Sequence, residues 1–303
     1  MNKPIEGGVM PAFITPFDEN GKIIDSGVKE LIEYHLESGL DAFYVGGSTG
    51  EAMIMTPEDR MHIAEISVKY VAGRAPVIVH VGTPDTETAV KLAKHAKKIG
   101  ADGISSVPPY YYKMSKEYIK EFYRAIAEAA ELPFLIYNIP QLTGVSISSA
   151  FMIEMMEIPN IIGLKFTDTN LEEFRKIKAY ENGRIKAFIG YDAMLLCALM
   201  MGGDGGIGSF YNIMPRAFSR VYDSFKEGNY EEAKETQWKI DKYIAIIKKY
   251  LSPANQPAIK VILKEMGFNS GTTRGPILPL KDDVSQAMLG ELRKEGFFEF
   301  VRE

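Results

Sequence analysis

The sequence predicts an α/β fold, a (β/α)8 or TIM barrel with a C-terminal helical extension. Short apolar segments alternate with amphipathic, helix-like segments over about two thirds of the 303 residues. Strands that are apolar on both faces and are each followed by a helix are typical of a parallel sheet. Eight such units make a closed barrel, and chains of this length routinely form a single one.

Eight strand candidates carry this alternation. In chain order they are GVMPAFIT (8–15), AFYVG (42–46), PVIVHV (76–81), DGISSV (102–107), PFLIYN (133–138), IIGLKF (161–166), KAFIG (186–190) and GGIGS (205–209). Helices are expected between them, for example at 26–39, 56–71, 85–100 and 115–130, because these stretches begin with Ser, Thr or Asp, as capped helices do.

After about residue 226 the pattern changes to helices only, at 230–251, 257–267 and near 285–298. We therefore expect a catalytic barrel over residues 1–226 and a helical extension over 227–303 that packs on it. The Met and aromatic positions of the extension are expected to be packing residues and not a cofactor site.

The composition excludes several classes of function. The net charge of −5, the pI near 5.6 and the lack of any Lys/Arg block argue against nucleic acid as a partner. The start, MNKPIEGG, has no apolar signal region, and no run approaches the ~18 apolar residues of a membrane span. We expect a cytoplasmic protein with no membrane partner.

Metal and thiol chemistry are not expected from the sequence. The histidines, His35, His62, His80 and His95, lack metal-ligand spacing, and all but His80 are expected on helix surfaces. Cys197 is the only cysteine, and its apolar neighbours predict a buried packing residue. Ser/His/Asp hydrolysis is not expected. No metal and no organic cofactor is expected.

Lys165 lies within an apolar strand, where an ammonium is costly to desolvate. Strand alternation places Ile162, Leu164 and Phe166 toward the helices and Gly163, Lys165 and Thr167 toward the barrel axis. Lys165 is then either a nucleophile for a Schiff base or a strand-end lysine that reaches water.

Two further strand ends carry polar groups. GGSTGE (46–51) offers backbone N–H groups and hydroxyls that suit a carboxylate or phosphate, although a capped glycine turn gives the same pattern. Tyr137 ends the fifth strand, beside the strand of Lys165, as a proton relay or as a buried structural tyrosine. The loop PPYYYK (108–113) either lines a pocket or reaches across a subunit interface.

GDGGIG (203–208) matches the dinucleotide-binding pattern G-x-G-x-x-G. That pattern requires a strand before the glycines and a helix starting at them. Here a helix-like segment precedes the glycines and Ile207 reads as part of a strand, so a dehydrogenase is not favoured. Gly206 and Gly208 are expected to clear space inside the barrel.

The ordered set GGSTGE, YNIP, GLKFT and GIGS resembles the N-acetylneuraminate lyase and dihydrodipicolinate synthase family of pyruvate-dependent class I aldolases. The resemblance covers nearly the whole chain. It implies that Lys165 forms an imine with a 2-keto acid and that Tyr137 shuttles protons. It further implies that Ser48 and Thr49 bind the pyruvate carboxylate, with Gly47 lending space, and that Tyr111 enters a neighbouring subunit's site in a homotetramer.

Two features resemble the sialic acid lyase branch of this family. Dihydrodipicolinate synthases carry an arginine just after YNxP, where this chain has Leu142, and GGSTGE replaces GTTGE. In the lyase branch, four positions hydrogen-bond the polyol chain of the sugar, and the resemblance assigns them to Thr167, Gly190, Asp192 and Ser209. One departure is Ala193, where the lyases usually have a glutamate that binds the glycerol end of sialic acid.

The resemblance thus implies reversible cleavage of N-acetylneuraminate to N-acetylmannosamine and pyruvate, with discrimination for the full sugar weakened by Ala193. Two alternatives remain open. One is a related aldolase or dehydratase acting on another 2-keto-3-deoxy sugar acid by the same imine. The other is a catalytically weak regulator that binds pyruvate or a sugar acid.

Overall fold

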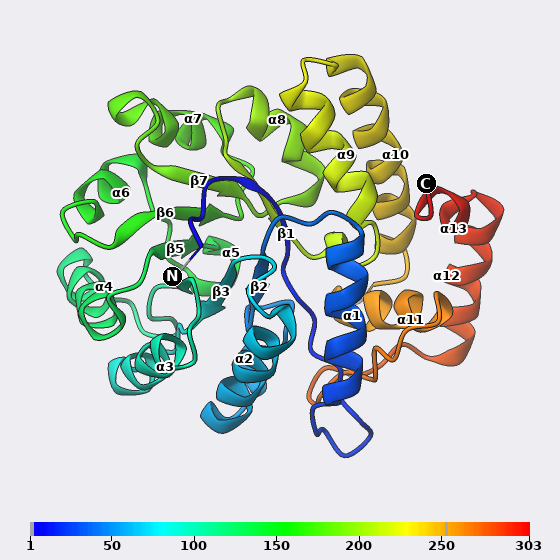
Figure 1. Cartoon of the computed structure of the whole chain (residues 1–303), viewed down its shortest axis with the longest axis horizontal. Helices are drawn as coiled ribbons and strands as arrows, with labels where there is room; N and C mark the ends of the chain where they lie inside the picture. Colours follow the sequence, from blue (N-terminus) through cyan, green and yellow to red (C-terminus); the bar gives the residue numbers. More distant parts are fainter. Residues whose placement is uncertain (1–2, 252–253) are drawn as a thin grey trace.

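The computed structural model describes residues 3–251 and 254–303, and within these ranges eight parallel strands form a nearly closed barrel ringed by helices (Figure 1). The strands are β1 (Gly8–Pro11), β2 (Phe43–Val45), β3 (Val77–His80), β4 (Gly103–Ser106), β5 (Phe134–Asn138), β6 (Ile161–Phe166), β7 (Lys186–Ile189) and β8 (Gly205–Gly208). They are hydrogen-bonded in the order β1-β8-β7-β6-β5-β4-β3-β2. The gap between β1 and β2 is bridged just beyond β1, where Phe13 N donates to Tyr44 O at 2.9 Å. All eight predicted strands are confirmed.

Helices follow the strands and cover the outside of the barrel (Figure 1). They are α1 (Asp25–Glu37), α2 (Pro57–Val71), α3 (Thr86–Lys98), α4 (Lys116–Ala130), α5 (Pro140–Thr143), α6 (Ser149–Met155), α7 (Leu171–Ala179), α8 (Leu195–Met200) and α9 (Pro215–Lys226). Three of the four predicted caps are confirmed, whereas the prediction is wrong for α1, which begins at Asp25 with Ile24 as an N-cap that makes no side-chain hydrogen bond. Thr56 and Asp59 form a capping box on α2, and the side chains of Asp85 and Ser115 cap α3 and α4.

The C-terminal region consists of α10 (Tyr230–Lys248), α11 (Gln256–Glu265), α12 (Asp282–Lys294) and α13 (Phe297–Phe300). α10 packs along α9, and α12 packs against α10 (Figure 1). One hydrophobic core runs through the barrel helices and these helices, since Ile240 and Leu263 belong to the same cluster as Leu31 and Ile63. The helical C-terminal region is confirmed, while the division at residue 226 stays a prediction.

A smaller apolar cluster fills the inside of the barrel, with Met10, Tyr44, Ile78, Leu135, Tyr137, Phe188 and Ile207 among its members. The predicted alternation of β6 holds for Leu164 and Phe166, which belong to the outer core. It is wrong for Ile162, which packs against the inner cluster. The register between β5 and β6 shifts here, since Phe134 pairs with Ile161 and Leu135 with Gly163, and the extra residue changes the parity.

Gly206 and Gly208 lie in β8, so GDGGIG is not a strand-to-helix turn. The prediction that this segment does not form a dinucleotide-binding turn is confirmed. The predicted reason for the glycines is wrong. A Cβ on Gly206 would lie 2.1 Å from the Tyr211 hydroxyl, and one on Gly208 would lie 2.3 Å from Asp192 Oδ1 and 2.6 Å from the Tyr211 ring. These glycines clear space for Tyr211, which belongs to the outer core, while Ile207 between them faces the barrel interior.

Two predictions about burial are also wrong. His35 is fully buried beneath Asn212, whose carbonyl lies 3.2 Å from Nε2, and burial lowers its pKa to about 4. Cys197 is exposed, because it lies on the outer side of the short helix α8. His62 and His95 lie near the surface as predicted, within 3.0 Å of carboxylates on neighbouring helices or at their starts.

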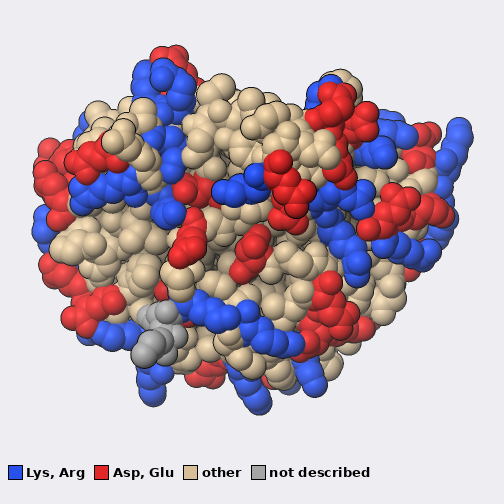
Figure 2. Space-filling model, turned by 45° about the horizontal axis from the view of Figure 1, so that its top comes forward, with Lys and Arg blue, Asp and Glu red and all other residues tan. Residues whose placement is uncertain are grey.

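Charged side chains of both signs are interspersed over the face drawn in Figure 2. Ion pairs between neighbouring helices include Lys120 with Glu154 at 2.9 Å and Lys91 with Glu58 at 3.1 Å. Of the helices within the described ranges, none has the length and apolar character needed to cross a membrane.

Candidate active site

A cavity of about 490 Å³ opens at the carboxyl ends of the barrel strands. Nine of the predicted site residues line it, namely Ser48, Thr49, Tyr137, Lys165, Thr167, Gly190, Asp192, Ala193 and Ser209. They come from the ends of five strands, β2, β5, β6, β7 and β8. Convergence of several strand ends on one cavity is the arrangement in which barrel enzymes place their chemistry.

Lys165 extends from the end of β6 into the base of this cavity with 3% of its surface exposed. Its Nζ lies 4.3 Å from the ring centroid of Tyr44 and 4.3 Å from that of Tyr137. The two rings hold the amine between them, since an ammonium over an aromatic face is attracted by the ring quadrupole. Lys165 is therefore a buried, fixed amine facing the barrel interior, and not a strand-end lysine reaching water.

The loop after β2, residues 46–51, forms one wall of the cavity and is here called the β2 loop. Thr49 Oγ1 lies 2.8 Å from Ser209 Oγ, so hydroxyls from two strand ends meet at the cavity. Two hydrogen bonds hold the loop, since Thr15 Oγ1 donates to Gly50 O at 2.8 Å and Gln256 Nε2, from a residue that also lines the cavity, donates to Ser48 O at 2.9 Å.

Polar side chains beneath the cavity are kept neutral by burial. Burial raises the pKa of Tyr44 well above its usual range, and its hydroxyl donates to Ser105 Oγ at 2.9 Å. Burial, together with the nearby Arg60 guanidinium, lowers the pKa of His80 well below its usual range. His80 Nε2 accepts from Val107 N at 3.2 Å, which ties β3 to the end of β4. Tyr44 and His80 were missed from the sequence.

The side of the cavity near β7 carries the residues assigned to a polyol. Asp192 Oδ1 accepts from Phe210 N at 2.8 Å, and burial raises the pKa of this carboxyl to about 6. Thr167 Oγ1 is buried and has no hydrogen-bond partner among the described residues. Gly190 is required beside it, because a Cβ there would lie 1.9 Å from Thr167 Oγ1. Ala193 leaves a small apolar surface at the same wall.

Two predicted residues lie outside the cavity. Gly47 belongs to the β2 loop but does not line the cavity; a Cβ there would lie 2.7 Å from the Tyr44 ring. Tyr111 is 88% exposed and has a φ of 81°, an unusual conformation for a residue with a side chain. Its neighbour Tyr112 is 70% exposed, so both rings project from the protein.

The described residues contain no group of three or more His, Cys, Asp or Glu side chains that could hold a metal ion. The groups that converge are one buried amine, phenols, hydroxyls and the carboxyl of Asp192. These groups bind carboxylates and carry out nucleophilic and proton-transfer chemistry.

Comparison with known proteins identifies the family. Residues 6–294 match the profile of the dihydrodipicolinate synthetase family. The chain is 33% identical to a 4-hydroxy-tetrahydrodipicolinate synthase from Alkaliphilus oremlandii, over 95% of this chain and 98% of that protein. It is 36% identical to an N-acetylneuraminate lyase from Escherichia coli (strain SMS-3-5 / SECEC), over 80% of this chain and 82% of that protein.

Among solved structures, YagE, an E. coli K12 prophage protein of the dihydrodipicolinic acid synthase family in complex with pyruvate, superposes with a TM-score of 0.91. It is 26% identical, and the match covers 96% of this chain and 99% of that one. The chain therefore belongs to the dihydrodipicolinate synthetase family, which includes N-acetylneuraminate lyases and consists of class I pyruvate aldolases.

Proposed function

We propose that this protein is a Schiff-base lyase that cleaves N-acetylneuraminate reversibly to N-acetylmannosamine and pyruvate. The observation that carries the proposal is the buried amine of Lys165, held between two phenol rings at the base of a cavity lined with hydroxyls. A position on a rigid strand, shielded from water, suits a nucleophile that must meet one carbon atom repeatedly in the same geometry.

In the proposed reaction, Lys165 Nζ attacks the keto carbon of the substrate, and loss of water gives a protonated imine. The imine accepts the electron pair of the C3–C4 bond as that bond breaks, which leaves an enamine of pyruvate on Lys165. Protonation of the enamine at C3 and hydrolysis of the imine release pyruvate. The family membership and the pyruvate bound to YagE support this part of the proposal.

Tyr137 is the proposed proton carrier. Breaking the C3–C4 bond turns the C4 hydroxyl into an aldehyde, so that proton must be accepted by a nearby group. Tyr137 neighbours Lys165 in the sheet, and its ring lies 4.3 Å from Lys165 Nζ. Ser48 and Thr49 are proposed to hold the substrate carboxylate, since both line the cavity on the wall formed by the β2 loop.

We propose a sialic acid and not a dicarboxylic acid as the substrate because of the side chains that line the cavity. Leu142, where a synthase carries an arginine, lines the cavity and offers no charge for a second carboxylate. Thr167, Asp192 and Ser209 also line the cavity and are proposed to bind the hydroxyls of the sugar, with Gly190 leaving space for them.

Ala193 is proposed to weaken discrimination for the full nine-carbon sugar. Restoring an ionised acceptor with Ala193→Glu should add about 1.5–3 kcal/mol of binding, a gain of about ten- to hundredfold in kcat/KM for N-acetylneuraminate. The measurement is pyruvate release from N-acetylneuraminate by the two proteins. An unchanged kcat/KM would contradict the assigned role of this position.

The substrate itself is tested by supplying the wild-type protein with N-acetylneuraminate and, separately, with shorter 2-keto-3-deoxy sugar acids. Pyruvate release from N-acetylneuraminate at the highest kcat/KM supports the proposal. Release from a shorter acid alone would assign the protein to another branch.

We also propose a cytoplasmic homotetramer in which Tyr111 of each subunit approaches a neighbour's site. The exposed aromatic rings of Tyr111 and Tyr112, and the unusual backbone of Tyr111, support a surface that is covered by another subunit. Light scattering should give four times the chain mass of 33.8 kDa.

A further inference from the structure

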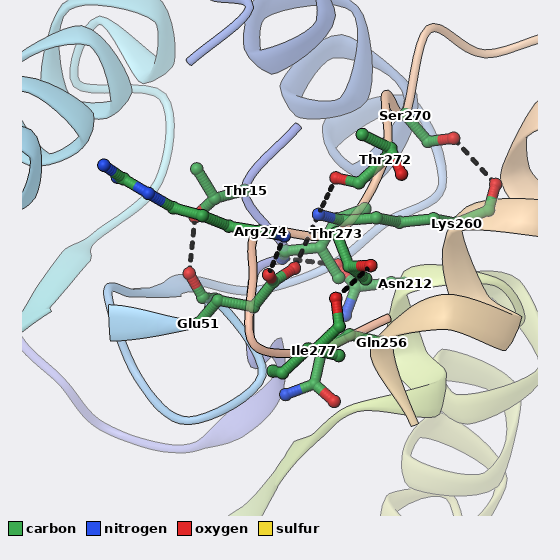
Figure 3. Close-up of polar contacts among 12 residues, drawn as sticks. Thr15, Glu51, Asn212, Gln256, Lys260, Ser270, Thr272, Thr273, Arg274 and Ile277 are labelled. Carbon is green, nitrogen blue, oxygen red and sulfur yellow. Dashed lines mark hydrogen bonds and ion pairs between the residues drawn. The ribbon is translucent and has the colours of Figure 1, made fainter. Parts of the chain in front are cut away.

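A buried ion pair connects the C-terminal helices to the wall of the cavity. Lys260 of α11 points toward Glu51, the last residue of the β2 loop (Figure 3). Lys260 Nζ lies 2.6 Å from Glu51 Oε1, and the exposed fractions of the two side chains are 3% and 0%. The two residues are 209 positions apart in the sequence.

Both charged groups have further partners. Lys260 Nζ also donates to Thr272 O at 2.6 Å, and Glu51 Oε2 accepts from Arg274 N at 2.8 Å (Figure 3). The ring of Phe17 lies 4.7 Å from Lys260 Nζ. Burial lowers the pKa of Lys260 to about 8, even though Glu51 opposes this shift. The pair is thus shielded from water, while both carboxylate oxygens and two of the three ammonium N–H groups are hydrogen-bonded.

Such a pair is a costly way to stabilise a fold, because desolvation offsets the attraction between the charges. Glu51 also has a φ of 62°, a left-handed conformation that a residue with a side chain rarely adopts. A strained backbone and a buried charge at one residue indicate a position whose geometry matters more than its contribution to stability.

The β2 loop is held by α11 at a second point. Gln256, the first residue of α11, donates from Nε2 to Ser48 O at 2.9 Å. The carbonyl of Ser48 and the carboxylate of Glu51 are therefore both hydrogen-bonded to side chains of α11. Between these two points lies Thr49, whose hydroxyl lines the cavity.

We propose that Lys260 and Glu51 are positioning residues that hold Ser48 and Thr49 in the arrangement that receives the carboxylate of the 2-oxo acid. This inference rests on the proposed function, since it assumes that the β2 loop binds that carboxylate. The helical C-terminal region then serves the active site through α11, and the ion pair pre-organises the loop before the ligand arrives.

The chain offers a matched control pair. Lys178 Nζ lies 2.6 Å from Asp204 Oδ2 and donates to Ile185 O at 2.8 Å, with exposed fractions of 7% and 15% for the two side chains of the ion pair. Asp204 precedes β8, so this pair lies at the other end of the barrel from the cavity. Lys260→Met and Lys178→Met both remove a buried lysine charge, and Asp204 keeps a second cation, Lys186 Nζ at 3.4 Å.

The experiment measures borohydride trapping of pyruvate on Lys165 as a function of pyruvate concentration. Lys260→Met should raise the half-saturating concentration by about tenfold or more, because a charge-assisted contact that positions the loop is lost. The trapping rate at saturation should remain that of the wild type. Lys178→Met should lower the unfolding temperature but leave the half-saturating concentration within about twofold of the wild-type value.

Gln256→Ala provides a second variant that does not leave a buried charge and keeps the test decisive if Lys260→Met does not fold. It should raise the half-saturating concentration by about threefold, the effect of one neutral hydrogen bond. Unchanged half-saturation in the folded variants overturns the inference while the proposed function stands. Failure of the wild type to trap pyruvate at all overturns the proposed function, and the inference with it.

Discussion

Gly190→Ala tests whether the space around Lys165 is required for its chemistry. The added Cβ would lie 1.9 Å from Thr167 Oγ1 and 3.1 Å from Lys165 Cε, whereas ordinary contacts begin at 3.4 Å. Thr167 would have to retreat by about 1.5 Å, and the lysine side chain would be displaced by a few tenths of an ångström. Because an error of about 1 Å in placing a reacting group costs about 100-fold, we expect kcat/KM to fall by about 30- to 100-fold.

The assay is pyruvate release from N-acetylneuraminate, with the free energy of unfolding measured by urea in parallel. Gly290→Ala is the matched control, because a Cβ at that position in α12 meets nothing within 4 Å. The control should gain about 0.5–1 kcal/mol of stability and keep its activity. Equal activity of Gly190→Ala and the wild type would refute the reasoning.

Three further predictions concern pH and proton transfer. Burial lowers the pKa of His35 to about 4, so below pH 6.5 the unfolded chain binds a proton that the native state does not. Stability should fall by about 3 kcal/mol between pH 7 and pH 4, and urea unfolding of His35→Gln should lack this part of the loss. Burial raises the pKa of Asp192 to about 6, so kcat/KM for the sugar should fall as the carboxylate is protonated below that pH. Asp192→Asn should show a flat profile in this range, and an acid limb that persists in it would assign the titration to another group. Tyr137→Phe keeps the ring beside Lys165 but removes the proton carrier, so kcat for cleavage should drop by about 100-fold or more. Its pyruvate adduct with borohydride should still form, and an unchanged kcat would exclude Tyr137 as the proton carrier.

The barrel could be predicted because each strand carries its own signal. Runs such as PVIVHV and IIGLKF are apolar on both faces, and the segments between them have capped helical patterns. The inward direction of Lys165 followed from its parity with Gly163 and Thr167. The inward direction of Ile162 could not be predicted. It results from a register shift between β5 and β6, which depends on the pairing of two strands and leaves no pattern in the sequence of either strand alone.

Contacts between distant segments could not be predicted. His35 resembles a surface residue of an amphipathic helix, yet residues after β8 cover it, with the carbonyl of Asn212 beside its ring. Glu51 and Lys260 each read as ordinary charged residues, and only the fold brings them within 2.6 Å of each other. Tyr44 could have been predicted in principle, because it is a polar residue in an apolar strand and its side chain faces the barrel interior, as that of Lys165 does.

The central claim is that Lys165 forms the imine. The most direct measurement is borohydride reduction of the full-length protein in the presence of pyruvate, followed by peptide mapping with mass spectrometry. The claim predicts one reduced pyruvate adduct per chain, on Lys165, and none in Lys165→Ala. An adduct on another lysine such as Lys260, or bound pyruvate with no adduct, would contradict it.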